Sequence, residues 1–410
     1  MMAESRTFRS LRERNAKLFF LGLLVSNVGT WLQATAQVLL VQELGGTGVQ
    51  LGIVMMCQFL PMLLFGLSAG AFADRVNRRR LTMWTQAGMG AQALLLAVIT
   101  GAGMATIPMV YGLSLVLGVL AAIDNPARRG MVVELVKTSE LSNALSLNTA
   151  VMTGSRVFGP SLAALLTAAI GTAWCFALNG LSFLAIIGAL AAIDPAKLHP
   201  TPPRPRGGRP VRDGLATVWA DPVLRRTLVV FSLVGTFAFN YQVSLPLIVR
   251  DNLDADKVVF GWLLSANSVG SVCGSLLTAR LRHVGQRWLY GALGILVAAS
   301  IVLSAARTIP VAFISGVAVG LGGAGFIAAA NVIFQLRSDP TMRSRILALT
   351  AVAFLGSTPI GAPITGFIGD RFGASWSLFY GSLIAMGCLV AGVAGVLRSD
   401  SRRGPLPSAG

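Results

Sequence analysis

Residues 18–41 read LFFLGLLVSNVGTWLQATAQVLLV, a run of apolar and small polar side chains without a single charge. A helix rises 1.5 Å per residue, so a run of this length crosses the roughly 30 Å hydrocarbon core of a bilayer. Eleven more stretches share this character, at 50–72, 81–101, 108–124, 145–168, 173–193, 225–249, 258–279, 288–306, 309–333, 346–368 and 375–397. The sequence therefore predicts an all-α polytopic membrane protein with 12 transmembrane helices.

The charge distribution predicts the orientation of these helices. The chain is 54% hydrophobic and only 12% charged, yet its net charge is +17. If the N-terminus is cytoplasmic, 28 of the 33 Lys and Arg residues face the cytoplasm; Arg250, Lys257, Arg307 and Arg371 face outward and Arg156 lies within a helix. This is the positive-inside pattern, which places both termini in the cytoplasm and the chain in the cell (inner) membrane. The excess charge thus indicates topology and contact with the lipid bilayer rather than nucleic-acid binding.

The twelve stretches form two groups of six. Residues 194–222 are rich in Pro and Arg and cannot form a membrane helix. Residues 154–174 and 356–376 match at an offset of 202, with Gly154, Ser155, Gly159, Gly171 and Trp174 meeting Gly356, Ser357, Gly361, Gly373 and Trp376. We therefore expect two pseudo-symmetric six-helix bundles. The predicted division is a basic N-terminus (1–17), a bundle (18–193), a linker (194–222), a second bundle (223–397) and a tail (398–410).

The loop after the second stretch, residues 70–80, reads GAFADRVNRRR. It resembles motif A of the major facilitator superfamily, and the resemblance implies a conformational latch built from Gly70, Asp74, Arg75, Arg78 and Arg79. Gly70 would permit close backbone approach, Asp74 would bind a helix N-terminus or Arg75, and the basic run would hold the loop at the lipid surface. A plain positive-inside loop is the alternative. The matching loop of the second half, near Gly274 to Arg287, lacks the acid and predicts a weaker latch.

The fifth stretch contains Gly154-Ser-Arg156-Val-Phe-Gly159-Pro160, which resembles motif C of exporters in the same superfamily. Gly159 and Pro160 predict a pliable helix, with ordinary small-residue packing as the alternative. Arg156 lies within the membrane, where a charge is costly unless it faces protein or water. It is a candidate to bind an anionic substrate group or to serve as an internal tether.

Residues 124–129, Asp-Asn-Pro-Ala-Arg-Arg, narrow the resemblance to the secretion-effector branch, which includes the enterobactin exporter and macrolide efflux proteins. The resemblance covers about residues 12–397 and implies proton-driven efflux of a siderophore or amphipathic drug-like molecule. The proton gradient is then the energy source, with no cofactor. Asp124 is either a proton-sensitive gate residue or a helix-end cap paired with Arg128, so both are gating or coupling candidates.

Polar side chains recur on one face of the first stretch, at Ser26, Thr30, Gln33 and Gln37. Ser232, Thr236 and Asn240 form a similar row in the seventh, the equivalent helix. Buried polar groups in a bilayer need a partner or water, so these rows predict either a hydrated substrate path or hydrogen bonds between helices.

Two other functions fit the same architecture: uptake of a small metabolite, and a non-transporting membrane scaffold or sensor. Catalysis is not expected, because His199 and His283 lie in predicted loops and the sequence shows no metal-binding spacing around its 4 cysteines. We expect a monomer that handles a small-molecule substrate.

Overall fold

The computed structural model describes residues 6–73, 75–199, 210–281, 283–338 and 358–401, with short pieces at 342, 346, 349–350 and 353–354. The described residues are nearly all helical, and no strand occurs among them. Nine helices within these residues are long and apolar enough to cross a membrane. The all-α membrane fold is therefore confirmed, whereas the exact count of twelve spans stays a prediction.

The chain divides into two compact units, Met1–Arg206 with Ala255–Ser265 (unit 1) and Gly207–Asp254 with Ala266–Gly410 (unit 2). The first of the three boundaries, between residues 206 and 207, falls inside the predicted linker 194–222, although the domain boundaries themselves stay a prediction. Part of that linker is a helix, α7 (Pro210–Ala220), too short to span a bilayer.

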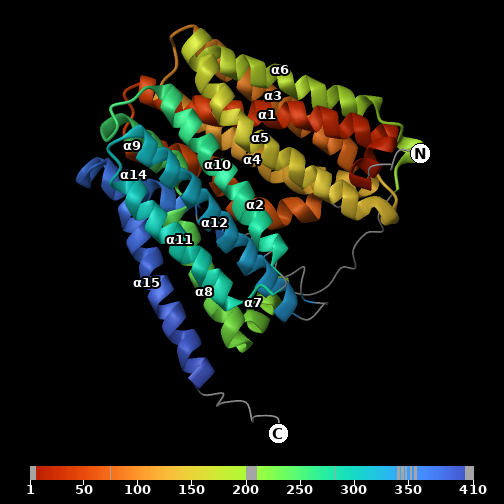
Figure 1. The fold of residues 1–410 in the computed structure, drawn as a ribbon. Helices are drawn as coiled ribbons and strands as arrows, with labels where there is room; N and C mark the ends of the chain where they lie inside the picture. Colours follow the sequence, from red (N-terminus) through yellow and green to blue (C-terminus); the bar gives the residue numbers. More distant parts are fainter. Residues whose placement is uncertain are drawn as a thin grey trace, which may run out of the picture. The chain divides into compact units, whose positions relative to one another are not determined.

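Unit 1 is built from α1 (Arg14–Glu43), α2 (Gly48–Ala73), α3 (Arg78–Gly101), α4 (Ile107–Glu134), α5 (Leu141–Ile170) and α6 (Thr172–Ala192). The short helices η1 (Arg6–Arg12), η2 (Thr138–Glu140) and η3 (Pro195–Lys197) complete it. α1 packs on α5 and α6, α3 packs on α6 and α4, and α2 packs on α4, so that α1, α3 and α6 run side by side (Figure 1). A core of Phe19, Phe20, Met89, Met131 and Ile186 joins these helices.

Unit 2 contains α7, α8 (Pro222–Ala238), α9 (Tyr241–Asp251), α11 (Gln286–Ser304), α12 (Ile309–Arg337), α14 (Thr358–Phe372) and α15 (Ala374–Ser401). It also holds α10 (Lys257–Arg280) from residue 266 onward. α15 packs on α8, α11 and α14, and α11 packs on α12. Phe231 of α8 lies at the centre of an aromatic cluster, with its ring 5.8 Å from Phe326 and 5.1 Å from Phe354.

Three predicted spans differ from the structure. The fourth does not end at residue 124, because α4 continues past Pro126 to Glu134. The seventh is not one helix: it breaks after Ala238, where the Asn240 side-chain amide donates to the Thr236 carbonyl (2.8 Å). Asn competes in this way with the backbone donors of a helix, which explains the break. The eleventh is described as a continuous helix only from Thr358, and the front of its predicted range lies largely outside the described residues.

The duplication seen in the sequence has a structural counterpart. Gly171 ends α5 with φ +87°, and its match Gly373 follows α14 with φ +99°, a conformation that glycine adopts without strain. Gly159 of α5 lies against Trp31 of α1, and its match Gly361 of α14 lies against Thr236 of α8. Equivalent glycines thus contact equivalent helices, while Gly356 and Ser357 lie outside the described residues.

Candidate functional site

A buried carboxylate lies in the interior of unit 1. Asp124 of α4 is 3% exposed, and it is the one acidic residue that is buried among the side chains the structure describes. Its Oδ1 accepts hydrogen bonds from Thr85 Oγ1 (2.9 Å) and Gln86 Nε2 (3.0 Å) of α3, and its Oδ2 accepts from Arg128 Nε (3.1 Å). Asp124 is therefore inside a helix and not a cap at its end, whereas the ion pair with Arg128 is present.

The hydrogen-bond network continues from Asp124 into α1. Ser26 Oγ, from the predicted polar stripe, donates to Gln86 Oε1 at 3.4 Å. On the other side, the Arg128 guanidinium also donates to Asn125 Oδ1 (3.1 Å). A single set of polar contacts therefore joins α1, α3 and α4, and a change in the charge of Asp124 would alter contacts on all three helices.

The rest of the stripe makes hydrogen bonds to neighbouring helices. Gln33 Nε2 donates to Gln92 Oε1 of α3 (3.1 Å), and Gln33 Oε1 accepts from Asn179 Nδ2 of α6 (2.6 Å). Gln37 Nε2 donates to Ser114 Oγ of α4 (2.6 Å). Gln33 and Gln37 therefore form hydrogen bonds between helices, which was one of the two predicted alternatives; the other was a hydrated substrate path. Thr30 differs from them, because it is exposed and its hydroxyl donates to the Ser26 carbonyl of its own helix (2.9 Å).

The hydrogen-bond partners of the stripe and of Asp124 were not identified from the sequence. Thr85, Gln86, Gln92, Ser114 and Asn179 are all buried and all bind a predicted site residue. The polar residues of 81–101 were the available signal, since Thr82, Thr85 and Gln86 follow helical spacing and face the same way.

The predicted polar row of unit 2 behaves differently. Ser232, Thr236 and Asn240 each donate from the side chain to the carbonyl four residues earlier in α8 (2.7–2.8 Å). The neighbouring Phe239 packs on Tyr241 and Phe354. Among the contacts that the structure describes, this row is satisfied by local hydrogen bonds.

The arginines of motif A join helices of unit 1. Arg78, the first residue of α3, forms an ion pair with Glu134 at the end of α4 (Nη1 to Oε1, 2.7 Å), and each side chain is only 17% exposed. Arg79 donates to the carbonyls of Leu190 (2.5 Å) and Ala191 (2.8 Å) at the end of α6. The guanidinium groups of these two residues therefore bind protein acceptors, while contact of the basic run with the lipid surface stays a prediction.

Two further motif A residues, Gly70 and Arg75, lie in more open surroundings. Arg75 is exposed, and Asp74 lies outside the described residues. A Cβ added at Gly70 would meet nothing within 4 Å among the described residues, so the close backbone approach expected there stays a prediction. Among the motif A residues that the structure describes, Arg78 and Arg79 are thus the ones seen to bind other helices at this end of unit 1.

The motif C residues lie in α5, which stays helical across Pro160. Gly159 packs on Trp31, whose Cβ would be 2.4 Å from a Cβ added to the glycine. Arg156 is exposed, and its guanidinium carbon lies 5.4 Å from the centroid of the Trp31 ring, a cation–π contact. Trp31 therefore contacts both Gly159 and Arg156 of motif C.

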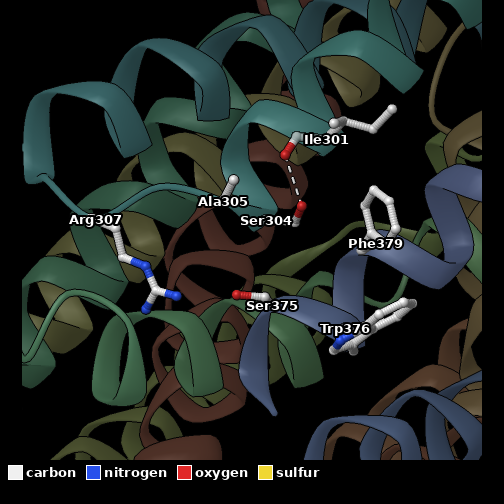
Figure 2. Close-up of a pocket in the computed structure, with 7 residues that line it drawn as sticks. All are labelled: Ile301, Ser304, Ala305, Arg307, Ser375, Trp376 and Phe379. Atoms are coloured by element: carbon white, nitrogen blue, oxygen red, sulfur yellow. Dashed lines mark hydrogen bonds between the residues drawn. The ribbon is translucent and has the colours of Figure 1, made fainter. Parts of the chain in front are cut away.

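One small pocket of unit 2 lies between the end of α11 and the start of α15 and has a volume of about 250 Å³ (Figure 2). Ile301, Trp376 and Phe379 form its apolar wall, and Arg307 and Ser375 lie across from them. None of the predicted path residues lines this pocket. Among the described residues, no group of His, Cys, Asp or Glu could hold a metal ion, and the 4 cysteines are free.

Comparison with known proteins places the chain in a family. Residues 5–403 match the transmembrane secretion effector family. The chain is 29% identical over 386 residues to the multidrug efflux pump Tap of Mycobacterium tuberculosis, covering 87% of this chain and 88% of the pump. It is 22% identical over 360 residues to the staphyloferrin A transporter of Staphylococcus aureus (87% and 90% covered) and 23% identical over 376 residues to macrolide efflux protein A of Streptococcus pyogenes (88% and 91%).

Solved structures agree on the fold. A bacterial homolog of the human lysosomal transporter Spinster superposes with a TM-score of 0.74 at 14% identity, over 95% of this chain and 96% of that chain. A bacterial homologue of the iron transporter ferroportin gives 0.72 at 14% identity, over 93% and 98%. The chain therefore belongs to the transmembrane secretion effector family of the major facilitator superfamily and is a multi-pass membrane transporter, not an enzyme.

Proposed function

We propose that this transporter exports a siderophore or an amphipathic drug-like molecule from the cytoplasm, by alternating access and at the expense of the proton gradient. Both termini are cytoplasmic in this proposal, as the distribution of basic residues indicates. Support for export comes from the relatives, whose names include a multidrug efflux pump and a macrolide efflux protein over nearly the whole chain. Support for a siderophore as one substrate class comes from the staphyloferrin A transporter.

The observation that carries proton coupling is the buried contact set of Asp124. Proton-driven transport needs an ionisable group at membrane depth whose charge state alters helix contacts. Asp124 meets this need, because its carboxylate holds Arg128 of its own helix and two donors of α3. Protonation would remove the charge that binds Arg128 and weaken the link between α3 and α4.

Everted membrane vesicles test this proposal. Vesicles that carry the protein should accumulate a fluorescent amphipathic cation such as ethidium under an inside-acid gradient and should stop when a protonophore is added. Equal accumulation with and without the gradient would reject proton-coupled export of this class of substrate.

Substitution of Asp124 separates coupling from folding. We expect Asp124→Asn to abolish gradient-driven accumulation while leaving exchange of labelled for unlabelled substrate within about twofold, because exchange needs no net proton movement. Asn keeps the size of the side chain and an acceptor oxygen for Thr85. If exchange falls as far as accumulation, Asp124 is a structural residue and the coupling group lies elsewhere.

A further inference from the structure

The pocket of about 250 Å³ between α11 and α15, called the α11–α15 pocket below, lies where membrane-spanning helices begin and end. α11 is long and apolar enough to span a bilayer and ends at Ser304, and α15 is likewise and begins at Ala374. Arg307 belongs to the short loop that connects α11 to α12. The pocket is therefore at the level where the hydrocarbon core of a membrane meets the lipid headgroups.

Arg307 brings a positive charge to this pocket. Its side chain is exposed and makes no hydrogen bond or ion pair with the residues that the structure describes, and none of the side chains that line the pocket is acidic. The nearest acid along the chain from the pocket-side Asn252 is Asp251, whose two carboxylate oxygens are bound by Arg250 (2.5 and 3.1 Å). An anion in the pocket would therefore meet Arg307 without competition from a lining carboxylate.

Ser375 supplies a second donor. Its Oγ accepts a hydrogen bond from Asn252 Nδ2 (2.9 Å), and the same amide donates to the Ser304 carbonyl (3.2 Å). Because the oxygen already accepts from this amide, the hydroxyl hydrogen is left to donate, and it has no acceptor among the described residues. In Figure 2 the Ser375 hydroxyl points toward the Arg307 guanidinium. Ser375 also lies in the first turn of α15, where the helix dipole favours a negative charge.

The opposite wall of the pocket is apolar and consists of Ile301, Trp376 and Phe379 (Figure 2). The Trp376 ring is 45% exposed and packs edge to face on Phe379, with 5.2 Å between the ring centroids. The exposed Phe372 ring continues this surface, 6.5 Å from Trp376. Tryptophan is enriched where a membrane protein meets the lipid headgroups. A ligand that fits both walls carries an anionic group on an apolar chain.

We propose that the α11–α15 pocket binds the phosphate group of an anionic phospholipid, held by Arg307 and Ser375, with the acyl chains along Trp376 and Phe372. The volume supports a single headgroup, because it is smaller than the roughly 300–1,000 Å³ of sites for drug-sized ligands. A zwitterionic headgroup fits less well, because its cation would lie close to the Arg307 charge. The inference depends on neither the direction nor the coupling of transport.

Native mass spectrometry of the delipidated full-length protein in detergent tests the proposal. Dioleoylphosphatidylglycerol should bind more tightly than dioleoylphosphatidylcholine. Arg307→Gln should lower the association constant for phosphatidylglycerol about fivefold, which corresponds to about 1 kcal/mol for one lost charge, and should leave phosphatidylcholine binding nearly unchanged. Arg371→Gln is the matched control, because Arg371 is also exposed, lies just before α15 in the chain and does not line the pocket.

A second variant closes the pocket without removing a charge. Ala305 lines the pocket and is exposed, so Ala305→Phe fills the space without disturbing a core. We expect Ala305→Phe to lower phosphatidylglycerol binding about as far as Arg307→Gln does. The double variant should lose little more than either single variant, because a filled pocket no longer brings the phosphate to Arg307. Ala305→Ser leaves the space open and should bind phosphatidylglycerol like the unchanged protein.

Three results would overturn the inference: an equal loss for Arg307→Gln and Arg371→Gln, additive losses for Arg307→Gln and Ala305→Phe, or equal binding of phosphatidylcholine. Displacement of the lipid by an excess of inorganic phosphate would also overturn it and would assign the site to a free phosphate instead. These measurements need no gradient and no substrate. Failure of transport with lipid selectivity intact would count against the proposed function alone.

Discussion

α1 of unit 1 and α8 of unit 2 occupy matching places in the duplicated sequence, yet their polar side chains form different kinds of hydrogen bond. α1 runs unbroken for 30 residues, and the polar side chains Gln33 and Gln37 bind α3, α4 and α6. α8 ends after 17 residues, and its polar side chains bind only carbonyls of their own helix among the described contacts. The polar side chains of α1 thus bind its neighbouring helices.

In unit 2, α8 meets its neighbours through close contacts of the backbone. Near the break between α8 and α9, Gly361 of α14 and Gly381 of α15 lie directly on the carbonyls of Thr236 and Phe237. Close approach through small residues is a common way for helices to associate in lipid, where the hydrophobic effect does not drive them together. A duplicated bundle can therefore keep its glycines while its polar contacts change.

The largest loss of stability is expected when a side chain is added at the backbone contact of Gly361 in unit 2. A Cβ at Gly361 would lie 1.7 Å from the Thr236 carbonyl oxygen, a backbone atom that cannot rotate away. We expect Gly361→Ala to destabilise the protein by about 3 kcal/mol, the upper part of the usual range for overpacking. The matched change in unit 1, Gly159→Ala, meets the Trp31 side chain and should cost about half as much. Thermal unfolding of the purified protein in detergent measures both.

A control for this pair lies on α15. Gly387 has nothing within 4 Å of an added Cβ among the described residues, so Gly387→Ala should be neutral or slightly stabilising. If Gly361→Ala proved as mild as Gly387→Ala, the contrast between backbone contacts in unit 2 and side-chain contacts in unit 1 would be wrong.

A smaller effect is expected at the end of unit 1, where Arg78 and Glu134 pair at 2.7 Å. Arg78→Gln should destabilise by about 2 kcal/mol, in the range for hydrogen bonds to charged groups. Arg80→Gln should change stability by less than about 0.5 kcal/mol, because Arg80 is exposed. A double-mutant cycle of Arg78→Gln with Glu134→Gln isolates the pair, and additive effects would show that the two side chains do not support each other.

Much of the fold could be predicted from apolar runs and charge placement, because a bilayer demands helices of defined length. The family could be predicted from short motifs, because Gly159 and the arginines each stand at the spacing that their motif, C or A, requires. The break at Asn240 could not, because it depends on one side chain competing for the Thr236 carbonyl inside an otherwise apolar run.

The candidate site was predicted in part. Gln33, Gln37 and Asp124 stood out as polar groups in apolar stretches. Their partners depend on which helices are neighbours, and the spacing of residues along the sequence does not show this. Arg78 and Arg79 were expected at lipid because sequence alone does not show that Glu134 and the end of α6 lie beside them. Long-range pairing of this kind needs the packed structure.

The smallest expected effect separates the two polar rows. Gln33→Leu removes hydrogen bonds to Gln92 and Asn179 and should destabilise by about 1 kcal/mol, since hydrogen bonds between membrane helices average about 0.6 kcal/mol each. Ser232→Ala removes only a bond to the Leu228 carbonyl of the same helix and should cost less than about 0.5 kcal/mol. Unfolding in mixed dodecyl sulfate and maltoside micelles resolves such differences. A larger loss for Ser232→Ala than for Gln33→Leu would mean that unit 2 also depends on its polar side chains, because the local bond in α8 would then outweigh two bonds between helices in unit 1.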